Sequence, residues 1–313
     1  MMELAVKPNV LWAVGGLYVL LLLASSIVSV LVRLHPERDY GELRRRVKSW
    51  WMMIVLFTLA ISLSRGLSFV FFGFVSFLAL KEYFSLIPTR RANRRVLFWA
   101  YLSIPIQYYW IGIGWYGMFI IFIPVYVFLF LPMRMVMIGD TKDFLRSAAS
   151  LHWGLMMMVF SLSHLSFLLA LPESGNPKGG GAGLVLFLTF LTEFNDVAQY
   201  VWGKMLGKRK IVPKVSPNKT WAGFLGGVAT TLFSAWLMAP WLTPFSVEHA
   251  LLAGLLIPMA GFIGDVVISA VKRDIGVKDS GNLLPGHGGV LDRIDSLIYT
   301  APLFFHFVHY LYF

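Results

Sequence analysis

Ten apolar stretches, separated by short charged loops, constrain this chain more than any other feature of its sequence. A transmembrane helix needs about 20 consecutive apolar residues, and several stretches reach that length while a few are shorter. We therefore predict an all-α fold, a polytopic integral membrane helix bundle with about eight to ten transmembrane helices. The stretches occupy residues 10–32, 50–64, 66–87, 96–111, 112–132, 151–171, 183–202, 221–241, 250–271 and 294–313.

The composition excludes a water-soluble enzyme. Hydrophobic residues make up 58% of the 313 residues and charged residues only 14%, which leaves too little polar surface to cover a globule of this size. The chain has no cysteine, which excludes disulfides, zinc ribbons and thiol catalysis. The first stretch is too long for the apolar core of a signal peptide, so we expect it to remain as an anchor.

The positive charge of the chain has a membrane explanation. Lys and Arg number 27 against 16 Asp and Glu, and 23 of these 27 cations lie in five segments. Because Lys and Arg in short loops mark the cytoplasmic side, we expect all five segments there and the N-terminus outside. Orientation then accounts for the net charge of +11 without nucleic acid as a partner. The segments are 33–48, 90–95, 134–146, 204–219 and 272–293.

Three carboxylates inside apolar stretches, Glu193, Asp196 and Asp265, point to function, since a buried charge is costly and is usually retained for a ligand or a partner charge. Asp265, Ser269 and Lys272 stand at i, i+4 and i+7 and so share one face of a helix. They can converge on one ligand. Alternatively, Asp265 pairs with Lys272 or Arg273 merely to ease its burial.

The loop that follows adds acidic and glycine residues. Asp292 and Asp295 are three apart where the last helix begins, and Gly288 and Gly289 precede them. Asp265, Asp292 and Asp295 thus provide three carboxylates from two helix ends. Such a set suits Mg²⁺ that keeps open coordination positions for phosphate. The glycine pair lets backbone N–H groups approach an anion closely.

This region resembles the signature of the phosphatidate cytidylyltransferase (CDP-diacylglycerol synthase) family. The resemblance implies an enzyme of phospholipid synthesis that joins CTP to phosphatidic acid, giving CDP-diacylglycerol and pyrophosphate. It further implies a bacterial-type inner (plasma) membrane location, an active site facing the cytoplasm, Mg²⁺ as cofactor, and K⁺ as a companion ion. The matching residues are Ser269, Lys272, Arg273, Lys278, Asp279, Gly281, Pro285, His287, Gly288, Gly289, Asp292, Arg293 and Asp295.

The resemblance also implies residue roles. The acidic residues implicated in metal binding match Asp265, Asp292 and Asp295. The residues expected in catalysis are Asp265, Ser269, Lys272, Arg273, Lys278, Asp279, His287 and Arg293, with His287 as a supporting member.

An upstream segment is similar to the same family and is expected to bind the nucleotide. It departs from the family pattern at Ala222, where a Glu is usual, and at Gln199. The missing carboxylate puts activity or substrate in question and suggests a divergent paralogue. The residues expected to bind substrate are Asn195, Asp196, Tyr200, Lys204, Ser216, Lys219 and Thr220, together with Gly288 and Gly289.

We expect two regions: N-terminal helices over 1–150, for packing, and a catalytic region over 151–313 with motif loops at 203–220 and 272–295. A homodimer packed through the N-terminal helices is left open. Two alternatives to the enzyme also stay open. One is an ion-coupled transporter that uses Asp196 and Asp265. The other is a catalytically altered paralogue that uses another lipid phosphate.

Overall fold

The structure is a computed structural model that describes residues 6–87, 94–139, 142–281 and 288–313. Helices account for most of these residues, and no named strand occurs among them. The helices are α1 (Pro8–Leu34), α2 (Gly41–Ser62), α3 (Arg65–Leu86), α4 (Arg94–Gly112), α5 (Tyr116–Ile121), α6 (Phe128–Val136), α7 (Phe144–Leu155), α8 (Leu162–Ala170), α9 (Gly180–Leu206), α10 (Trp221–Leu242), α11 (Val247–Asp274), α12 (Leu291–Ile294) and α13 (Leu297–Tyr312).

Two π-helical turns and one 3₁₀ turn complete the chain path. The π-helical turn η2 (Phe122–Val127) joins α5 to α6, and η3 (Met156–Ser161) joins α7 to α8. The 3₁₀ turn η4 (Glu173–Gly175) precedes α9. Each of these two joined pairs therefore corresponds to one of the predicted apolar stretches.

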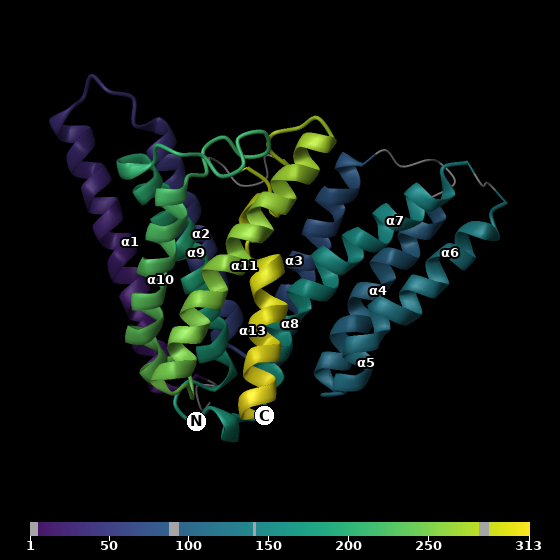
Figure 1. The fold of residues 1–313 in the computed structure, drawn as a ribbon. Coiled ribbons are helices and arrows are strands. Elements are labelled where there is room, and N and C mark those ends of the chain that lie inside the picture. Colours follow the sequence, from purple (N-terminus) through teal and green to yellow (C-terminus); the bar gives the residue numbers. More distant parts are fainter. Residues whose placement is uncertain (1–5, 88–93, 140–141, 282–287) are drawn as a thin grey trace.

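The helices confirm a polytopic membrane bundle. Seven helical segments of the described chain are long and apolar enough to cross a membrane: α1, α3, α5 to α6, α7 to α8, α9, α10 and α11. Three further helices, α2, α4 and α13, correspond to the remaining predicted stretches and run beside the others (Figure 1). The first turns of α2 carry Glu42, Arg44, Arg45 and Arg46, which makes that helix longer and more polar than its apolar stretch.

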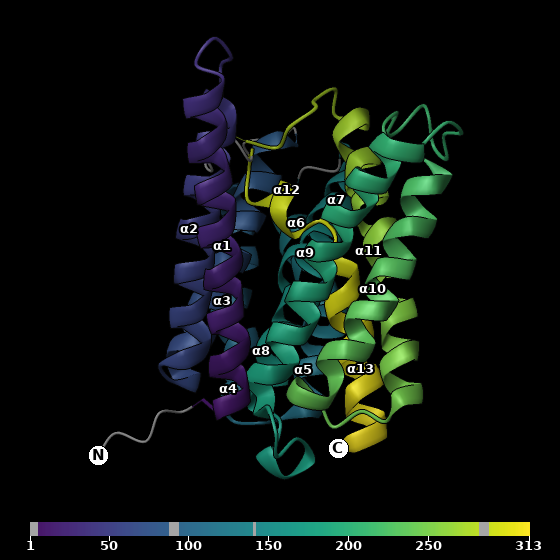
Figure 2. The ribbon, with the colours of Figure 1, turned by 90° about the vertical axis from the view of Figure 1, so that its left-hand side faces the viewer.

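The basic connections gather at one end of the bundle. Figure 1 shows the α1–α2, α6–α7, α9–α10 and α11–α12 connections at the top, where α3 ends and α4 begins. Figure 2 shows the α1–α2, α9–α10 and α11–α12 connections at the same end. The start of α1, the end of α13 and the α8–α9 and α10–α11 connections lie at the opposite end. The alternation that the loop charges predicted is therefore present in the fold.

Glycine allows close packing of the helices that carry the predicted motifs. A Cβ atom at Gly223 of α10 would lie 2.6 Å from the backbone oxygen of Gln199 in α9. A Cβ at Gly264 of α11 would overlap the backbone oxygen of Asp295. These approaches bring polar residues of α9, α10 and α11 together beside the start of α13.

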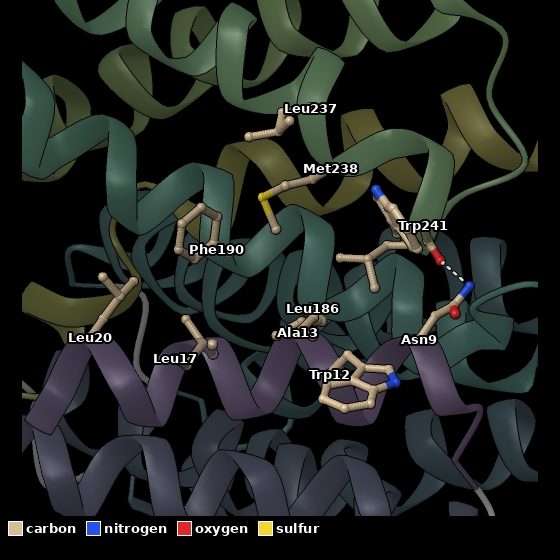
Figure 3. A pocket seen from close by; sticks show the side chains of 12 residues that line it. Asn9, Trp12, Ala13, Leu17, Leu20, Leu186, Phe190, Leu237, Met238 and Trp241 are labelled. Atoms are coloured by element: carbon tan, nitrogen blue, oxygen red, sulfur yellow. Dashed lines mark hydrogen bonds between the residues drawn. The ribbon is translucent and has the colours of Figure 1, made fainter.

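An apolar cavity of about 690 Å³ lies between α1, α9 and α10 (Figure 3). Leu17, Phe190 and Met238 contribute to its wall, and the side-chain amide of Asn9 donates to the backbone oxygen of Trp241 at 3.0 Å. None of its lining residues is charged. A triphosphate would find no partner there, so a polar site must lie elsewhere.

Candidate active site

The two motif segments predicted from sequence meet at a partly buried ion pair. Lys219, which directly precedes the N-cap of α10, places its Nζ 2.5 Å from Oδ2 of Asp265 in α11. Their side chains are only 17% and 20% exposed. The same ammonium donates to Oε1 of Gln199 in α9 at 3.2 Å. One lysine thus connects three helices.

The local structure around Lys219 fixes its direction. Thr220 is the N-cap of α10, and its Oγ1 accepts the backbone N–H of Gly223 at 3.1 Å. An antiparallel bridge joins Thr220 to Lys210, and the backbone N–H of Ile211 donates to the Lys219 oxygen at 3.1 Å. The loop is therefore closed on itself just before the helix starts, which holds the Lys219 side chain against α11.

The charge balance keeps Lys219 protonated. Burial opposes the charged form, but the carboxylates of Asp265 and Asp196 outweigh it and raise the pKa of Lys219 above its ordinary value. A cation is thus maintained between α9 and α11.

The predicted common face of α11 is confirmed, whereas the predicted alternative pairing of Asp265 is wrong. Ser269 Oγ donates to Asp265 Oδ1 at 3.2 Å, and Lys272 is buried on the same side of the helix. Lys272 does not pair with Asp265, because its Nζ lies 2.6 Å from Oδ1 of Asp292. Asp265 takes its partner from the α9–α10 loop instead.

Asp292 organises the loop before α12. Its Oδ2 accepts the backbone N–H groups of Ser280 at 3.0 Å and Gly289 at 3.1 Å, while Oδ1 binds Lys272. Burial opposes ionisation of this carboxyl, but Lys272 and the two amides outweigh it and hold its pKa below the ordinary value. Gly288, with φ of +80°, allows the sharp turn that brings these amides to Asp292.

Asp196 and Asp295 complete an acidic group around Asp265. Ser296 Oγ donates to Asp196 Oδ2 at 2.8 Å, while Asp196 Oδ1 is buried without a partner among the described residues. Burial, together with the carboxylates of Asp265 and Asp196, raises the pKa of Asp295 well above its ordinary value. The group consists of hard oxygen donors, which is the ligand type that Mg²⁺ prefers.

These oxygen donors are of the type that binds a divalent ion, but they are not arranged as a preformed coordination site. Among the described residues, no group of three or more His, Asp or Glu side chains is arranged to hold a metal ion. Lys219 lies against Asp265, and Ser296 holds one oxygen of Asp196. The positive charge that the acidic group needs is supplied in this structure by lysine.

Glu82 is a site residue that sequence reasoning missed. It lies in α3, and its carboxylate accepts the backbone N–H groups of Val290 at 2.8 Å and Leu291 at 3.0 Å. A Cβ atom at Gly289 would overlap Glu82 Oε1, so glycine at this position is explained by the carboxylate beside it. The available signal was a carboxylate within the apolar stretch 66–87, at a distance from any motif.

Several predicted residues lie apart from the buried pairs. Tyr200 is 66% exposed, and the Lys204 ammonium lies 6.0 Å from the centre of its ring. Lys278 and Asp279 are exposed on the α11–α12 connection. His287 lies outside the described residues, so its predicted role stays a prediction.

Other predicted residues support the architecture. Asn195 is fully buried and accepts from Thr231 Oγ1 at 3.3 Å, joining α9 to α10. The backbone oxygen of Ser216 accepts the N–H of Lys219 at 3.2 Å within the α9–α10 loop. Arg273 is exposed and donates to the backbone oxygen of Val277 at 3.1 Å.

Arg293 follows Asp292 in α12. Its Nε is buried without a partner among the described residues, and its charge acts on Asp196. It therefore adds a third cation, beside Lys219 and Lys272, to the side chains near the acidic group.

The fold and these side chains define a class: a polytopic membrane protein that gathers lysine, arginine and aspartate at the ends of its C-terminal helices. The chain belongs to the cytidylyltransferase family, which matches residues 44–311. It is 51% identical over 298 residues to the protein named "Uncharacterized protein YnbB" of Escherichia coli K12, covering 95% of this chain and 98% of that protein.

Similarity also extends to phosphatidate cytidylyltransferases. The protein of that name from Staphylococcus aureus COL is 42% identical over 128 residues, which is 40% of this chain and 49% of that protein. A phosphatidate cytidylyltransferase of Staphylococcus epidermidis is 39% identical over 127 residues, again 40% and 49%. The match spans about half the length of these two enzymes.

Proposed function

We propose that this protein is a membrane-embedded cytidylyltransferase that joins CTP to phosphatidic acid or a related lipid phosphate, with release of pyrophosphate. The observation that carries the proposal is the Lys219–Asp265 pair, because it unites the two motif segments beside a group of carboxylates. Family membership supports this enzyme over the ion-coupled transporter.

The chemistry is a substitution at phosphorus. A phosphate oxygen of the lipid forms a bond to the α-phosphorus of CTP, and the bond from that phosphorus to the bridging oxygen breaks. The electron pair leaves with pyrophosphate. Such a reaction needs alignment and neutralisation of charge more than covalent help from the protein.

The cations of the site are suited to that task. Lys272 is buried and Lys219 partly buried, and both bind carboxylates in this structure. The buried Nε of Arg293 has no hydrogen-bond partner among the described residues. We assign these three to the phosphates, because preorganised cations in a dry site stabilise developing negative charge strongly. No general base is required, since the lipid phosphate is already an anion.

Asp196, Asp265 and Asp295 would hold Mg²⁺ in this proposal. When bound, the ion would neutralise phosphate oxygens as a Lewis acid. We keep Asp265 and Asp295 from the sequence-based set and assign Asp292 to the loop, because both of its oxygens are engaged there. The K⁺ ion stays an expectation of the resemblance.

We further propose that the protein lies in the inner (plasma) membrane with this site on the cytoplasmic side. CTP is in the cytosol and the lipid phosphate lies in the adjacent leaflet, so a site at the basic end of the bundle can meet both. The gathering of the basic connections at the end that carries Lys219 and Lys272 supports this orientation.

A lipid phosphate other than phosphatidic acid is the second candidate acceptor. Similarity to the staphylococcal phosphatidate cytidylyltransferases covers 40% of the chain, whereas similarity to YnbB covers 95%. Ala222, where the family usually has Glu, lies in the first turn of α10 directly after the Lys219 loop. The helices outside the shared region are free to recognise a different headgroup.

The test uses the purified full-length protein in mixed micelles with MgCl₂ and CTP labelled in the cytidine. Phosphatidic acid, lysophosphatidic acid and a polyprenyl phosphate are supplied separately. We expect label in a lipid product together with pyrophosphate for one of them. Binding of CTP without turnover on any acceptor supports an inactive paralogue, and absence of both refutes the proposal.

A further inference from the structure

A second cavity, of about 550 Å³, lies between α1 and α2 at the end of the bundle that carries the basic connections. Figures 1 and 2 show these two helices side by side at the edge of the molecule. Only 11% of the most apolar part of α1 is buried inside the protein, so most of this helix is not covered by other helices. The cavity is therefore open to molecules that approach within the membrane.

Three cations line this cavity: Arg33 of α1 and Arg44 and Lys48 of α2. No acidic residue belongs to its lining. None of the three cations forms an ion pair or a side-chain hydrogen bond with another described residue. The neighbouring Arg46, by contrast, is paired with Glu42. Membrane orientation requires basic residues in this loop, but it does not require that they converge unpaired on one cavity.

The rest of the lining divides into a polar and an apolar part. The indole N–H of Trp51 donates to Ser25 Oγ at 3.0 Å across the two helices. Val28, Val32 and Val47 supply the apolar wall. A ligand that fits such a lining has an anionic head and a hydrocarbon body.

We propose that this cavity binds the phosphate headgroup of an anionic membrane phospholipid. Charge complementarity carries the assignment, because three unpaired cations in a membrane-facing cavity match the headgroup phosphate, and the valines match the start of the acyl chains. Basic pockets between transmembrane helices are known to bind anionic headgroups. None of the lining residues belongs to the candidate active site, so the proposal stands independently of the proposed reaction.

The test measures thermal unfolding of the full-length protein in neutral detergent during titration with phosphatidylglycerol, which is not a proposed substrate. We expect a saturable rise in Tm for the unsubstituted protein and none with phosphatidylcholine. The double variant R33Q/K48Q removes two of the cations. It should raise the half-saturating concentration of phosphatidylglycerol about 30-fold, from the usual contribution of a cation near a membrane surface.

A matched control removes the same charge from the same region. Arg38 and Arg45 do not line the cavity, so R38Q/R45Q should leave the half-saturating concentration unchanged. S29W retains every charge and fills the cavity, and it should also abolish the Tm rise, which keeps the test informative if R33Q/K48Q fails to fold. Equal weakening by the control, equal stabilisation by phosphatidylcholine, or competition by sodium phosphate at millimolar concentration would each overturn the proposal.

Discussion

Glu82 in α3 accepts the backbone N–H of Val290 at 2.8 Å, across 208 positions of sequence. The next amide, that of Leu291, binds the other carboxylate oxygen. An N-terminal helix thus holds the loop that precedes α12, and with it Asp292. The N-terminal helices therefore contribute directly to the architecture of the candidate site, in addition to their packing role.

We predict that Glu82→Gln lowers kcat at least tenfold while KM for CTP changes little. The amide retains one acceptor oxygen but places an NH₂ group against a backbone N–H, leaving a buried donor unsatisfied. Glu82→Asp should restore part of kcat, because it can still accept one amide. Glu37→Gln, in the exposed α1–α2 connection, is the control. A normal kcat for Glu82→Gln would show that this contact does not position the loop.

Lys219→Met should lower kcat/KM more than 100-fold. It removes a cation assigned to the phosphates and leaves the partly buried Asp265 without its partner. Lys214→Met changes an exposed lysine in the same loop and should retain near-normal activity. Steady-state rates with CTP as the varied substrate measure both. Equal effects of the two substitutions would assign Lys219 only a general electrostatic contribution.

Magnesium titration separates the roles of the acidic residues. Asp295→Asn should raise the Mg²⁺ concentration for half-maximal activity at least tenfold, because it removes a proposed ligand. Asp292→Asn should lower the maximal rate without that shift, and should make the 275–290 connection more sensitive to limited proteolysis. A comparable shift in Asp292→Asn would restore this residue to the metal set that the sequence suggested.

Removal of divalent ions with EDTA should abolish turnover of the unsubstituted protein, and MgCl₂ in excess should restore it. Thermal unfolding measured in parallel checks that the chelator leaves the fold intact. Full activity after exhaustive chelation would exclude the proposed role of Asp196, Asp265 and Asp295.

Gly223→Ala should destabilise the protein by about 1–3 kcal/mol, the usual cost of an overpacked contact. The added methyl group meets backbone atoms of α9, which cannot rotate away as a side chain could. Gly15→Ala is the control, since a Cβ there meets nothing within 4 Å and alanine favours the helix. Denaturant unfolding in detergent compares the two. An unaffected Gly223→Ala would mean that α9 and α10 can separate freely.

Hydropathy and loop charge were sufficient to predict the helices and their alternation. Apolar length specifies a helix in a bilayer, and the position of Lys and Arg specifies which ends lie together. The one-turn helix α12 was not anticipated, because Asp292 was assigned to the start of the last helix, whereas α13 begins at Leu297.

Which side chains pair with one another was harder to predict than where each side chain lies along its helix. The face shared by Asp265, Ser269 and Lys272 follows from helical periodicity, but the partner of Asp265 comes from a different loop. The contact from Glu82 joins the first and last thirds of the chain. Such contacts depend on how helices cross, and a single sequence does not encode the crossing in any local pattern.

In the absence of substrate, Lys219 and Asp265 neutralise each other's charge between the C-terminal helices. A Mg²⁺ ion or a triphosphate that bound alone would displace one of these two side chains. The other charge would then be left without a partner and shielded from water, which is energetically costly. A triphosphate that arrives together with its own counterion can exchange partners with both side chains at once. In the proposed reaction, this exchange would disfavour states in which only the ion or only the triphosphate is bound.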